Sequence, residues 1–260
     1  MGYFKIDSEE FKFFERANRI VADTLSLLSK SVKPGISTLE LDKIAEDFIL
    51  SKDAKPAFKG YGSNKNPFPA TICASVDEVI VHGIPNYEPL QEGQIISIDC
   101  GAEYKGYFGD SAITCLVGVV SEEKRRLVEI TEQALFKGIE AAITKNKVYD
   151  ISRAIQTFVE ANGYSLTREL VGHGIGKVLH DEPPVPNFVP LLLHRNNYPN
   201  IKLEKGLAIA IEPMVHMGNK ETETKKDGWT VVTKDRKPAA HWEHTVIVDD
   251  GKPIIMTLRS

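Results

Sequence analysis

The chain has 260 residues, of which 42% are apolar and 26% are charged, and its formal net charge is −4. This composition is typical of a soluble globular protein with ample material for a core. The slight acidic excess argues against nucleic acid as the main ligand, because nucleic-acid-binding domains concentrate basic charge. No apolar run approaches the roughly 20 residues that span a bilayer, and no basic-then-apolar leader begins the chain.

The three cysteines, Cys73, Cys100 and Cys115, are an odd number and form no C-x-x-C pair. Such usage fits free thiols in a reducing compartment better than a disulfide framework. We therefore expect a cytoplasmic protein that does not associate with membranes.

Two helices are predicted in the first fifty residues. Asp7 has Glu10 at capping-box spacing, and apolar residues then recur at helical spacing until Pro34. A second capping box, Ser37 with Glu40, opens the next helix. The stretch 53–69, rich in Lys, Gly, Asn and Pro, predicts an irregular loop, and short strands are expected at 71–76 and 79–82.

A hairpin is predicted over residues 95–120. Apolar β-branched residues lead to Asp99, a Gly-containing turn follows, and a second strand carries Asp110. Cross-strand side chains approach within about 5–8 Å, and two acids this close in apolar strands repel each other unless a cation lies between them. Taken alone, the stretch fits equally well an exposed turn with two solvated acids.

The second half repeats the order of helices and then strands. Helices are expected from Ser121 and from Asp150 to about Ala161, and strands are expected at 170–175, 207–214, 229–233 and 242–248. This order indicates an α+β fold in which helices cover one side of a largely antiparallel sheet. No linker divides the halves, so residues 1–260 are interpreted as a single domain.

Three later segments place metal-ligand side chains among apolar or glycine residues. His173 lies between glycines, Glu212 ends an apolar strand, and Glu243 starts another. Singly, they could be a hydrogen-bonded core histidine and strand acids paired with lysines. Together with Asp99 and Asp110 they would bury four negative charges, which two divalent cations neutralise. Carboxylate and imidazole ligands suit Mn, Fe, Co or Zn, so we predict a two-metal site.

At these residues the sequence resembles the methionine aminopeptidases of the pita-bread fold. The resemblance covers about residues 8–255, and the matching segments are 78–85, 172–176, 211–214, 227–230 and 243–245. It implies a curved antiparallel sheet, covered by helices on its outer side, with pseudo-two-fold halves. The short N-terminus without a zinc-binding extension is similar to the bacterial type I enzymes. Prolidase and aminopeptidase P carry an additional N-terminal domain, for which we expect no room here.

The resemblance also implies a role for each ligand. Asp110 and Glu243 would bridge both metal ions, Asp99 would complete one ion, and His173 with Glu212 would complete the other. A metal-bridging hydroxide would attack the first peptide bond, and Glu212 would handle its proton.

His82 and His180 would contact substrate and stabilise the tetrahedral intermediate, although His82 could instead fix its Gly-Ile-Pro turn. The methionine side chain would enter an apolar pocket lined by Cys73, Trp229, Tyr61 and Phe68.

The implied substrates are the N-termini of nascent, deformylated proteins whose second residue is small and uncharged. Transient ribosome contact is expected only from this substrate, and the family suggests a monomer. An X-Pro peptidase and a non-catalytic binding protein on the same fold remain as alternatives. The sequence departs from the family pattern at Leu179, in a longer loop at 60–70, and in an insertion at 188–200 that could be a rim, a partner surface, a lid or simple packing.

Overall fold

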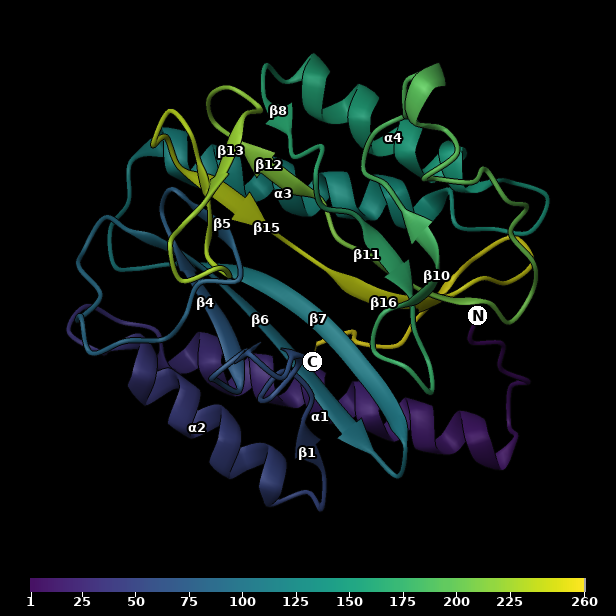
Figure 1. Cartoon of the computed structure of the whole chain (residues 1–260), viewed down its shortest axis with the longest axis horizontal. Coiled ribbons are helices and arrows are strands. Elements are labelled where there is room, and N and C mark those ends of the chain that lie inside the picture. Colours follow the sequence, from purple (N-terminus) through teal and green to yellow (C-terminus); the bar gives the residue numbers. More distant parts are fainter. Residues whose placement is uncertain (260) are drawn as a thin grey trace.

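The computed structural model describes residues 1–259. In each half of the chain two helices precede the strands, as the sequence predicted (Figure 1). The helices are α1 (Glu9–Ser31) and α2 (Thr38–Leu50) in the first half, and α3 (Glu122–Glu140) and α4 (Val148–Ala161) in the second.

The strands are short apart from two long ones in the first half. That half contains β1 (Lys55–Pro56), β2 (Gly62–Ser63), β3 (Asn66–Pro67), β4 (Ile72–Val76), β5 (Val79–Val81), β6 (Ile95–Tyr104) and β7 (Tyr107–Leu116). The second half contains β8 (Ser165–Leu166), β9 (Gly172–Gly174), β10 (Asp181–Val185), the 3₁₀ turn η1 (Leu192–His194), β11 (Ala208–Ile211), β12 (Met214–His216), β13 (Thr222–Thr224), β14 (Val231–Thr233), β15 (Ala239–His241), β16 (His244–Ile247) and β17 (Ile254–Ile255).

Every ladder between these strands is antiparallel within the described residues. The β6–β7 hairpin pairs from Ile95–Leu116 to Tyr104–Tyr107 and is flanked by β4 and β1. In the second half the main sheet has the order β10-β9-β11-β16-β17, and β12 pairs with β8 and β15. The predicted antiparallel α+β architecture is therefore confirmed.

The two halves join at the centre of the molecule through β7. The amide of Glu243 donates to the carbonyl of Ala112 at 3.0 Å, and the hydroxyl of Thr245 donates to the carbonyl of Asp110 at 2.7 Å. β16 thereby runs alongside β7, as Figure 1 shows. The strands of both halves form one curved surface, and the segments that carry the predicted ligands meet on it.

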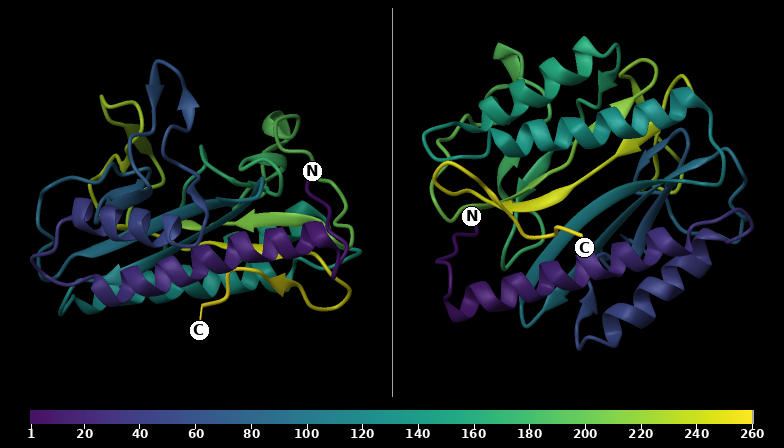
Figure 2. Two further views of the ribbon diagram at one scale, coloured as in Figure 1. Left: turned by 90° about the horizontal axis from the view of Figure 1, so that it is seen from below. Right: turned by 180° about the vertical axis from the view of Figure 1, so that it is seen from behind.

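The helices lie on one side of this surface. Figure 2 shows the long helices on one side of the strands, while the β2–β3 hairpin, β13–β14 and the η1 segment rise on the other. This arrangement matches the predicted curved sheet with helices on its outer side.

The N-cap of helix α1 is Ser8, one residue later than the predicted Asp7. Ser8 accepts from the amide of Phe11 at 3.1 Å, and Asp7 instead adopts a left-handed backbone with φ of 68°. Serine is an equally good N-cap, so the helix is preserved. The capping box of Ser37 and Glu40 forms as predicted.

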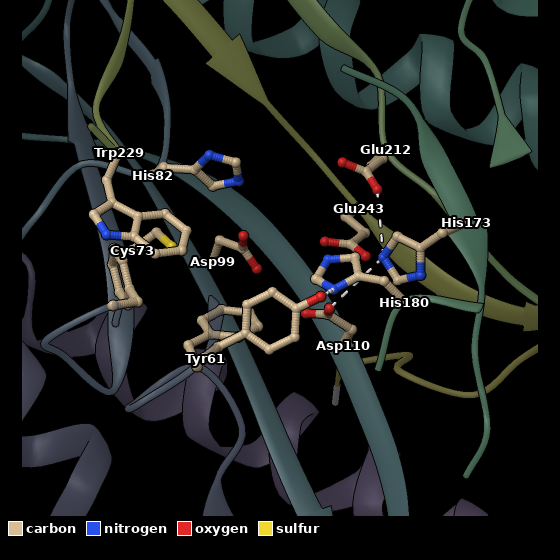
Figure 3. Close-up of a pocket in the computed structure, with 12 residues that line it drawn as sticks. Tyr61, Cys73, His82, Asp99, Asp110, His173, His180, Glu212, Trp229 and Glu243 are labelled. Atoms are coloured by element: carbon tan, nitrogen blue, oxygen red, sulfur yellow. Dashed lines mark hydrogen bonds and ion pairs between the residues drawn. The ribbon is translucent and has the colours of Figure 1, made fainter. Parts of the chain in front are cut away.

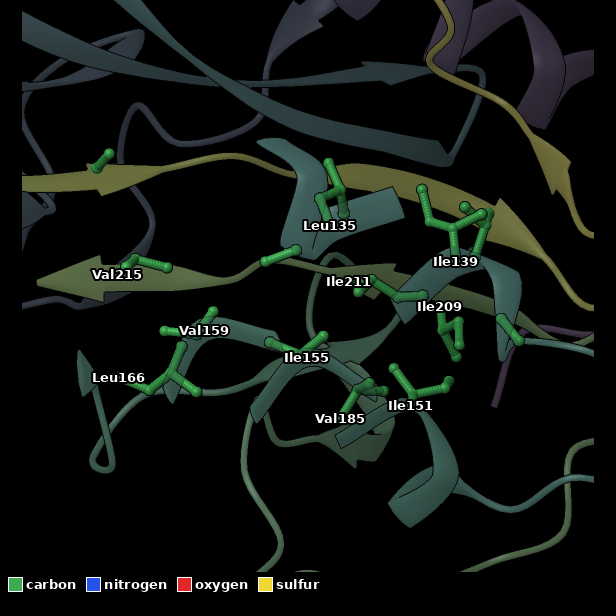
Figure 4. Packing of buried hydrophobic residues seen from close by; sticks show 14 of the residues in the cluster. Leu135, Ile139, Ile151, Ile155, Val159, Leu166, Val185, Ile209, Ile211 and Val215 are labelled. Atoms are coloured by element: carbon green, nitrogen blue, oxygen red, sulfur yellow. The ribbon is translucent and has the colours of Figure 1, made fainter. Parts of the chain in front are cut away.

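The core of the second half fixes the strand that leads to Glu212. Leu135 and Ile139 of α3 and Ile155 of α4 pack with Ile209 and Ile211 of β11, and all five side chains are buried (Figure 4). Because these side chains interdigitate, β11 cannot slide without opening voids in the core. The end of β11 therefore holds a fixed position.

Three strand predictions need correction. The stretch 53–69 is not wholly irregular, because β1 pairs with β6 and β2 pairs with β3. The single strand predicted at 207–214 is interrupted at Glu212 and Pro213, and the strand predicted at 242–248 begins only at His244, so Glu212 and Glu243 lie between strands rather than within or at the start of one. No helix within residues 1–259 is both long enough and apolar enough to cross a membrane.

Candidate metal centre and substrate pocket

The five predicted ligands converge at the junction of the two halves (Figure 3). Ligand atoms of Asp99, Asp110 and Glu243 lie within 4.8 Å of one another, and so do those of His173, Glu212 and Glu243. Glu243 is common to both groups. The sequence placed these residues in four separate segments, and the fold brings them to one point.

The register of the sheet explains how the first group forms. Asp99 of β6 lies opposite Ala112 of β7, and Ala112 in turn exchanges backbone hydrogen bonds with Glu243. Residues in one row of a sheet point to the same face, and so does Asp110, two positions from Ala112. Three carboxylates are thus directed to one side of the sheet.

The second group forms where two ladders are interrupted. The β11–β16 ladder ends with the pair Ile211–His244, and the β12–β15 ladder begins with Met214–His241. Glu212 and Glu243 therefore face each other in the gap between the ladders. Pro213 follows Glu212 and has no amide hydrogen to continue the pairing, which accounts for the interruption.

His173 is oriented by its own strand. Its Nδ1 lies 2.9 Å from the carbonyl oxygen of Gly174, which can only accept, so Nδ1 carries the proton. The Nε2 lone pair then points inward, 3.6 Å from Glu212 Oε1 and 3.9 Å from Asp110 Oδ2. A Cβ on Gly174 would lie 1.9 Å from the carbonyl oxygen of Glu182, so β10 approaches β9 this closely only because glycine stands there.

The buried carboxylates of the cluster would be stabilised by a bound cation. Burial raises the pKa of Asp99 to about 7, and burial together with the neighbouring carboxylates raises the pKa values of Asp110, Glu212 and Glu243. Burial lowers the pKa of His173 to about 3, which keeps this imidazole neutral and able to bind a metal.

Buried carboxylate oxygens without hydrogen-bond partners indicate whether these residues suit a metal ion. Asp99 Oδ1, Asp110 Oδ1 and Glu243 Oε1 are buried without a hydrogen-bond partner among the described residues. Buried polar atoms are normally paired, and unpaired buried charges are costly. Orphaned carboxylate oxygens beside a neutral imidazole are suitable donors for divalent transition metals. These residues fit a metal centre.

A pocket of about 220 Å³ opens over this centre. Its polar side is formed by the five ligands with His82 and His180, and its other side is formed by Phe58, Tyr61, Phe68, Cys73 and Trp229. The four residues predicted to surround the methionine side chain all line it. Phe58 was not predicted, although it stands in the same loop three residues before Tyr61.

The two accessory histidines border the same pocket. His180 lies at the mouth, and its Nδ1 is 2.7 Å from the hydroxyl of Tyr61. His82 has φ of 58°, a left-handed conformation that is uncommon for a side chain of this size. The His82 ring lies edge-on to Trp229 with 6.3 Å between centroids, so it faces the pocket (Figure 3).

Sequence reasoning missed His241, which ends β15 beneath the metal centre. His241 is 1% exposed, and its Nε2 lies 3.8 Å from Glu212 Oε2 without a hydrogen-bond partner among residues 1–259. A polar residue two positions before Glu243, on the same face of an apolar strand, was the available signal.

Two departures from the family pattern have simple structural outcomes. Leu179 is buried in the aromatic cluster around Phe4 and does not line the pocket. In the 188–200 insertion, Leu191, Leu192 and Leu193 are 73–89% exposed, so these three side chains do not serve core packing.

Comparison with known proteins supports the same assignment. Residues 12–250 match metallopeptidase family M24. The methionine aminopeptidase of Clostridium acetobutylicum is 46% identical over 255 residues, which cover 96% of each chain. The crystal structure of methionine aminopeptidase from Thermotoga maritima superposes with a TM-score of 0.91 at 35% identity, over all of both chains.

More distant structures share the fold. Prolidase from Pyrococcus furiosus superposes with a TM-score of 0.77 at 21% identity, covering 97% of this chain and 65% of that one. At this identity the likeness describes architecture alone, whereas the full-length matches at higher identity are to methionine aminopeptidases. The chain therefore belongs to metallopeptidase family M24, among its methionine aminopeptidases.

Proposed function

We propose that this chain removes the N-terminal methionine from polypeptides whose second residue is small and uncharged. The substrates in this proposal are the N-termini of nascent, deformylated proteins. The observation that carries it is the junction of a carboxylate-rich metal centre and an apolar pocket in one cavity, with Asp99 and Cys73 paired on adjacent strands. Metal chemistry and recognition of an apolar side chain therefore meet at one place.

The metal centre would be held by Asp99, Asp110, His173, Glu212 and Glu243. Two divalent ions balance the four carboxylates, and the donor set suits Co, Mn, Fe or Zn. When bound, such ions supply Lewis-acid chemistry that polarises the scissile carbonyl and lowers the pKa of water. Asp110 and Glu243 would serve both ions, because Glu243 is common to the two groups described above and Asp110 also forms a close group with His173 and His180.

The side chains of Glu212, His82 and His180 carry out the remaining steps. Glu212 takes the proton of the attacking water and returns it to the leaving amine, because its carboxylate lines the cavity beside the other ligands. His82 contacts the substrate from the opposite side of the cavity. His180 stabilises the oxyanion by donating a hydrogen bond from Nε2.

Tyr61 sets the tautomer that His180 needs for this task. If the Tyr61 hydroxyl donates to Nδ1 across the 2.7 Å contact, the proton of the neutral imidazole resides on Nε2. Burial lowers the pKa of His180, which favours this neutral form. Tyr61 is therefore a positioning residue for His180 as well as part of the pocket wall.

Specificity follows from the shape of the cavity. Cys73, Phe68 and Trp229 present an apolar surface to the methionine side chain, and the crowded floor around the ligands disfavours a bulky second residue. We further propose that residues 1–260 form a single domain that acts as a monomer in the cytoplasm. The three free cysteines support a reducing compartment. Ribosome contact stays a prediction from the substrate.

The test compares two peptide series with and without a chelator. We expect hydrolysis of Met-Gly and Met-Ala peptides that stops when metal is removed, and no hydrolysis of Xaa-Pro peptides. Faster turnover of Xaa-Pro peptides would favour the prolidase alternative. Absence of turnover in both series, with metal bound, would favour a non-catalytic protein.

A further inference from the structure

The loop at 60–70 contains a small hairpin that borders the substrate pocket. β2 pairs with β3 through Gly62–Pro67 and Ser63–Asn66. Its base is closed by two backbone bonds, from Gly60 N to Phe68 O and from Phe68 N to Tyr61 O, each 2.8 Å long. The hairpin therefore holds Tyr61 and Phe68, two pocket-lining aromatic residues, opposite each other.

The hairpin also packs on Trp229, which comes from the other half of the chain. A Cβ added to Gly62 would lie 2.7 Å from Cη2 of the Trp229 ring, so the backbone of β2 touches the indole directly. Phe68 meets the same ring edge-on with 5.3 Å between centroids. The indole is thus held between Gly62 and Phe68.

A polar contact fastens the hairpin to the turn that carries Trp229. Asn66 Nδ2 donates to the carbonyl of Asp227 at 3.0 Å. The carboxylate of Asp227 accepts from the amides of Trp229 and Thr230, both at 2.8 Å, which makes this turn rigid. The hairpin and the turn consequently form one wall, from which Tyr61, Phe68 and Trp229 line the pocket.

The hairpin has no evident role in the hydrophobic core. All residues from Gly62 to Pro67 are exposed, and the segment rises from the face opposite the helices (Figure 2). Its packing is directed to Trp229 and to the two aromatic residues at its base. This arrangement is expected of an element that shapes a binding site rather than one that stabilises the fold.

We propose that the β2–β3 hairpin is a specificity-determining element that sets the width of the methionine pocket by fixing the indole of Trp229. This inference rests on the proposed function, because it assigns the pocket to the methionine side chain. Gly62 supplies the close approach, since any larger residue would displace the ring. Asn66 supplies the hydrogen bond that joins the hairpin to the turn of Asp227. Neither residue touches the reacting atoms, so both act by positioning Trp229.

Two glycines of the same loop provide a matched test. Gly62 has φ of 99° and contacts Trp229, whereas Gly60 has φ of 86° and nothing within 4 Å of an added Cβ. Gly62→Ala and Gly60→Ala therefore impose similar backbone strain, but only the first pushes on the indole. We expect Gly62→Ala to raise KM for a Met-Gly peptide about tenfold with kcat little changed. The preference of Gly62→Ala for Met-Gly over Leu-Gly peptides should also fall severalfold. Gly60→Ala should resemble wild type in KM and in this preference.

Two asparagines provide the second matched pair. Asn66→Asp keeps the shape of the side chain but replaces its donor with an acceptor that faces the Asp227 carbonyl. Asn64→Asp adds the same charge at the exposed tip, where Asn64 makes no side-chain hydrogen bond within residues 1–259. We expect a rise in KM of about threefold to tenfold for Asn66→Asp only, on the scale of one hydrogen bond.

A spectroscopic readout separates this inference from the proposed function. The chain has two tryptophans, so 5-fluorotryptophan labelling gives two ¹⁹F resonances, which a Trp242→Phe variant assigns. We expect Gly62→Ala and Asn66→Asp to shift or broaden the Trp229 resonance, whereas their controls leave it in place. An unperturbed resonance, or equal KM changes in a variant and its control, would overturn the inference. If wild type does not cleave Met-Gly peptides, the proposed function fails, and an unshifted resonance would still refute the role of the hairpin.

Discussion

Asp99 and Asp110 are diagonal neighbours across the β6–β7 ladder, because Asp99 pairs with Ala112 and Asp110 pairs with Gly101. Both side chains therefore lie on one face of the hairpin, and the predicted closeness of the two acids is confirmed. Two buried carboxylates in this relationship form a stable arrangement only with a cation between them or with bound protons.

Removal of one metal ligand should abolish turnover without unfolding the protein. We expect Asp99→Asn and His173→Ala to lose at least one equivalent of bound metal and nearly all activity. Thermal unfolding of metal-free Asp99→Asn should be close to that of metal-free wild type, because this change removes a costly buried charge. Metal analysis and peptide assays check this, and wild-type rates in either variant would refute the ligand assignment.

Tyr61 should affect the chemical step only through His180, which is the residue that contacts the oxyanion. His180→Ala is expected to lower kcat by about 10²-fold, the usual scale for the loss of one oxyanion donor. Tyr61→Phe should lower kcat less, because His180 remains but loses its preferred tautomer. In the double variant, Tyr61→Phe should lower kcat no further than His180→Ala does alone. Additive losses would mean that Tyr61 acts independently of His180.

Metal binding should release protons near neutral pH. Burial raises the pKa of Asp99 to about 7 in the metal-free protein, and burial together with the neighbouring carboxylates raises the pKa values of Asp110, Glu212 and Glu243. Carboxyls with raised pKa values hold protons at pH 6–7, and a metal must displace them, so apparent metal affinity should increase from pH 6 to pH 8. Calorimetric titrations at pH 6.5 in buffers of different ionisation enthalpy would reveal the release. Identical heats in all buffers would contradict it.

The three thiols should be unreactive in the folded protein. Burial raises the pKa of Cys115 to about 12 and also raises the pKa values of Cys73 and Cys100, so little thiolate exists at pH 8. A disulfide reagent should therefore react slowly with native protein and rapidly with three thiols after unfolding. A fast-reacting native thiol would show that one site is more open than its burial indicates.

Close packing of α1 on β7 should be intolerant of a single methyl group. A Cβ on Gly109 would lie 2.7 Å from the backbone of Asn18, so Gly109→Ala must push the helix from the strand that carries Asp110. We expect a loss of about 1–3 kcal/mol in the free energy of unfolding. Denaturant unfolding of the metal-free protein measures this change. An unaltered midpoint would mean that the helix shifts at no cost.

Much of this arrangement was predictable from local sequence, and the exceptions have physical causes. Periodicity and capping residues located the four helices, and the β6–β7 hairpin followed from its turn and its β-branched strands. Sequence could not show that Glu212 and Glu243 lie in strand interruptions, because that depends on long-range pairing between β11, β12, β15 and β16. The places of His241 and Phe58 beside the site are likewise set by partners distant in sequence, although each stands close in the chain to a predicted site residue.

The central claim is that five side chains from distant segments hold two catalytic metal ions in one cavity. Its most direct test is titration of the apoprotein with Mn²⁺ or Co²⁺ while bound metal and Met-Gly hydrolysis are measured together. We predict no activity without metal and binding of about two equivalents in wild type, which Asp110→Asn should reduce. Full hydrolysis by protein that holds no metal would contradict it, as would unchanged binding in that variant.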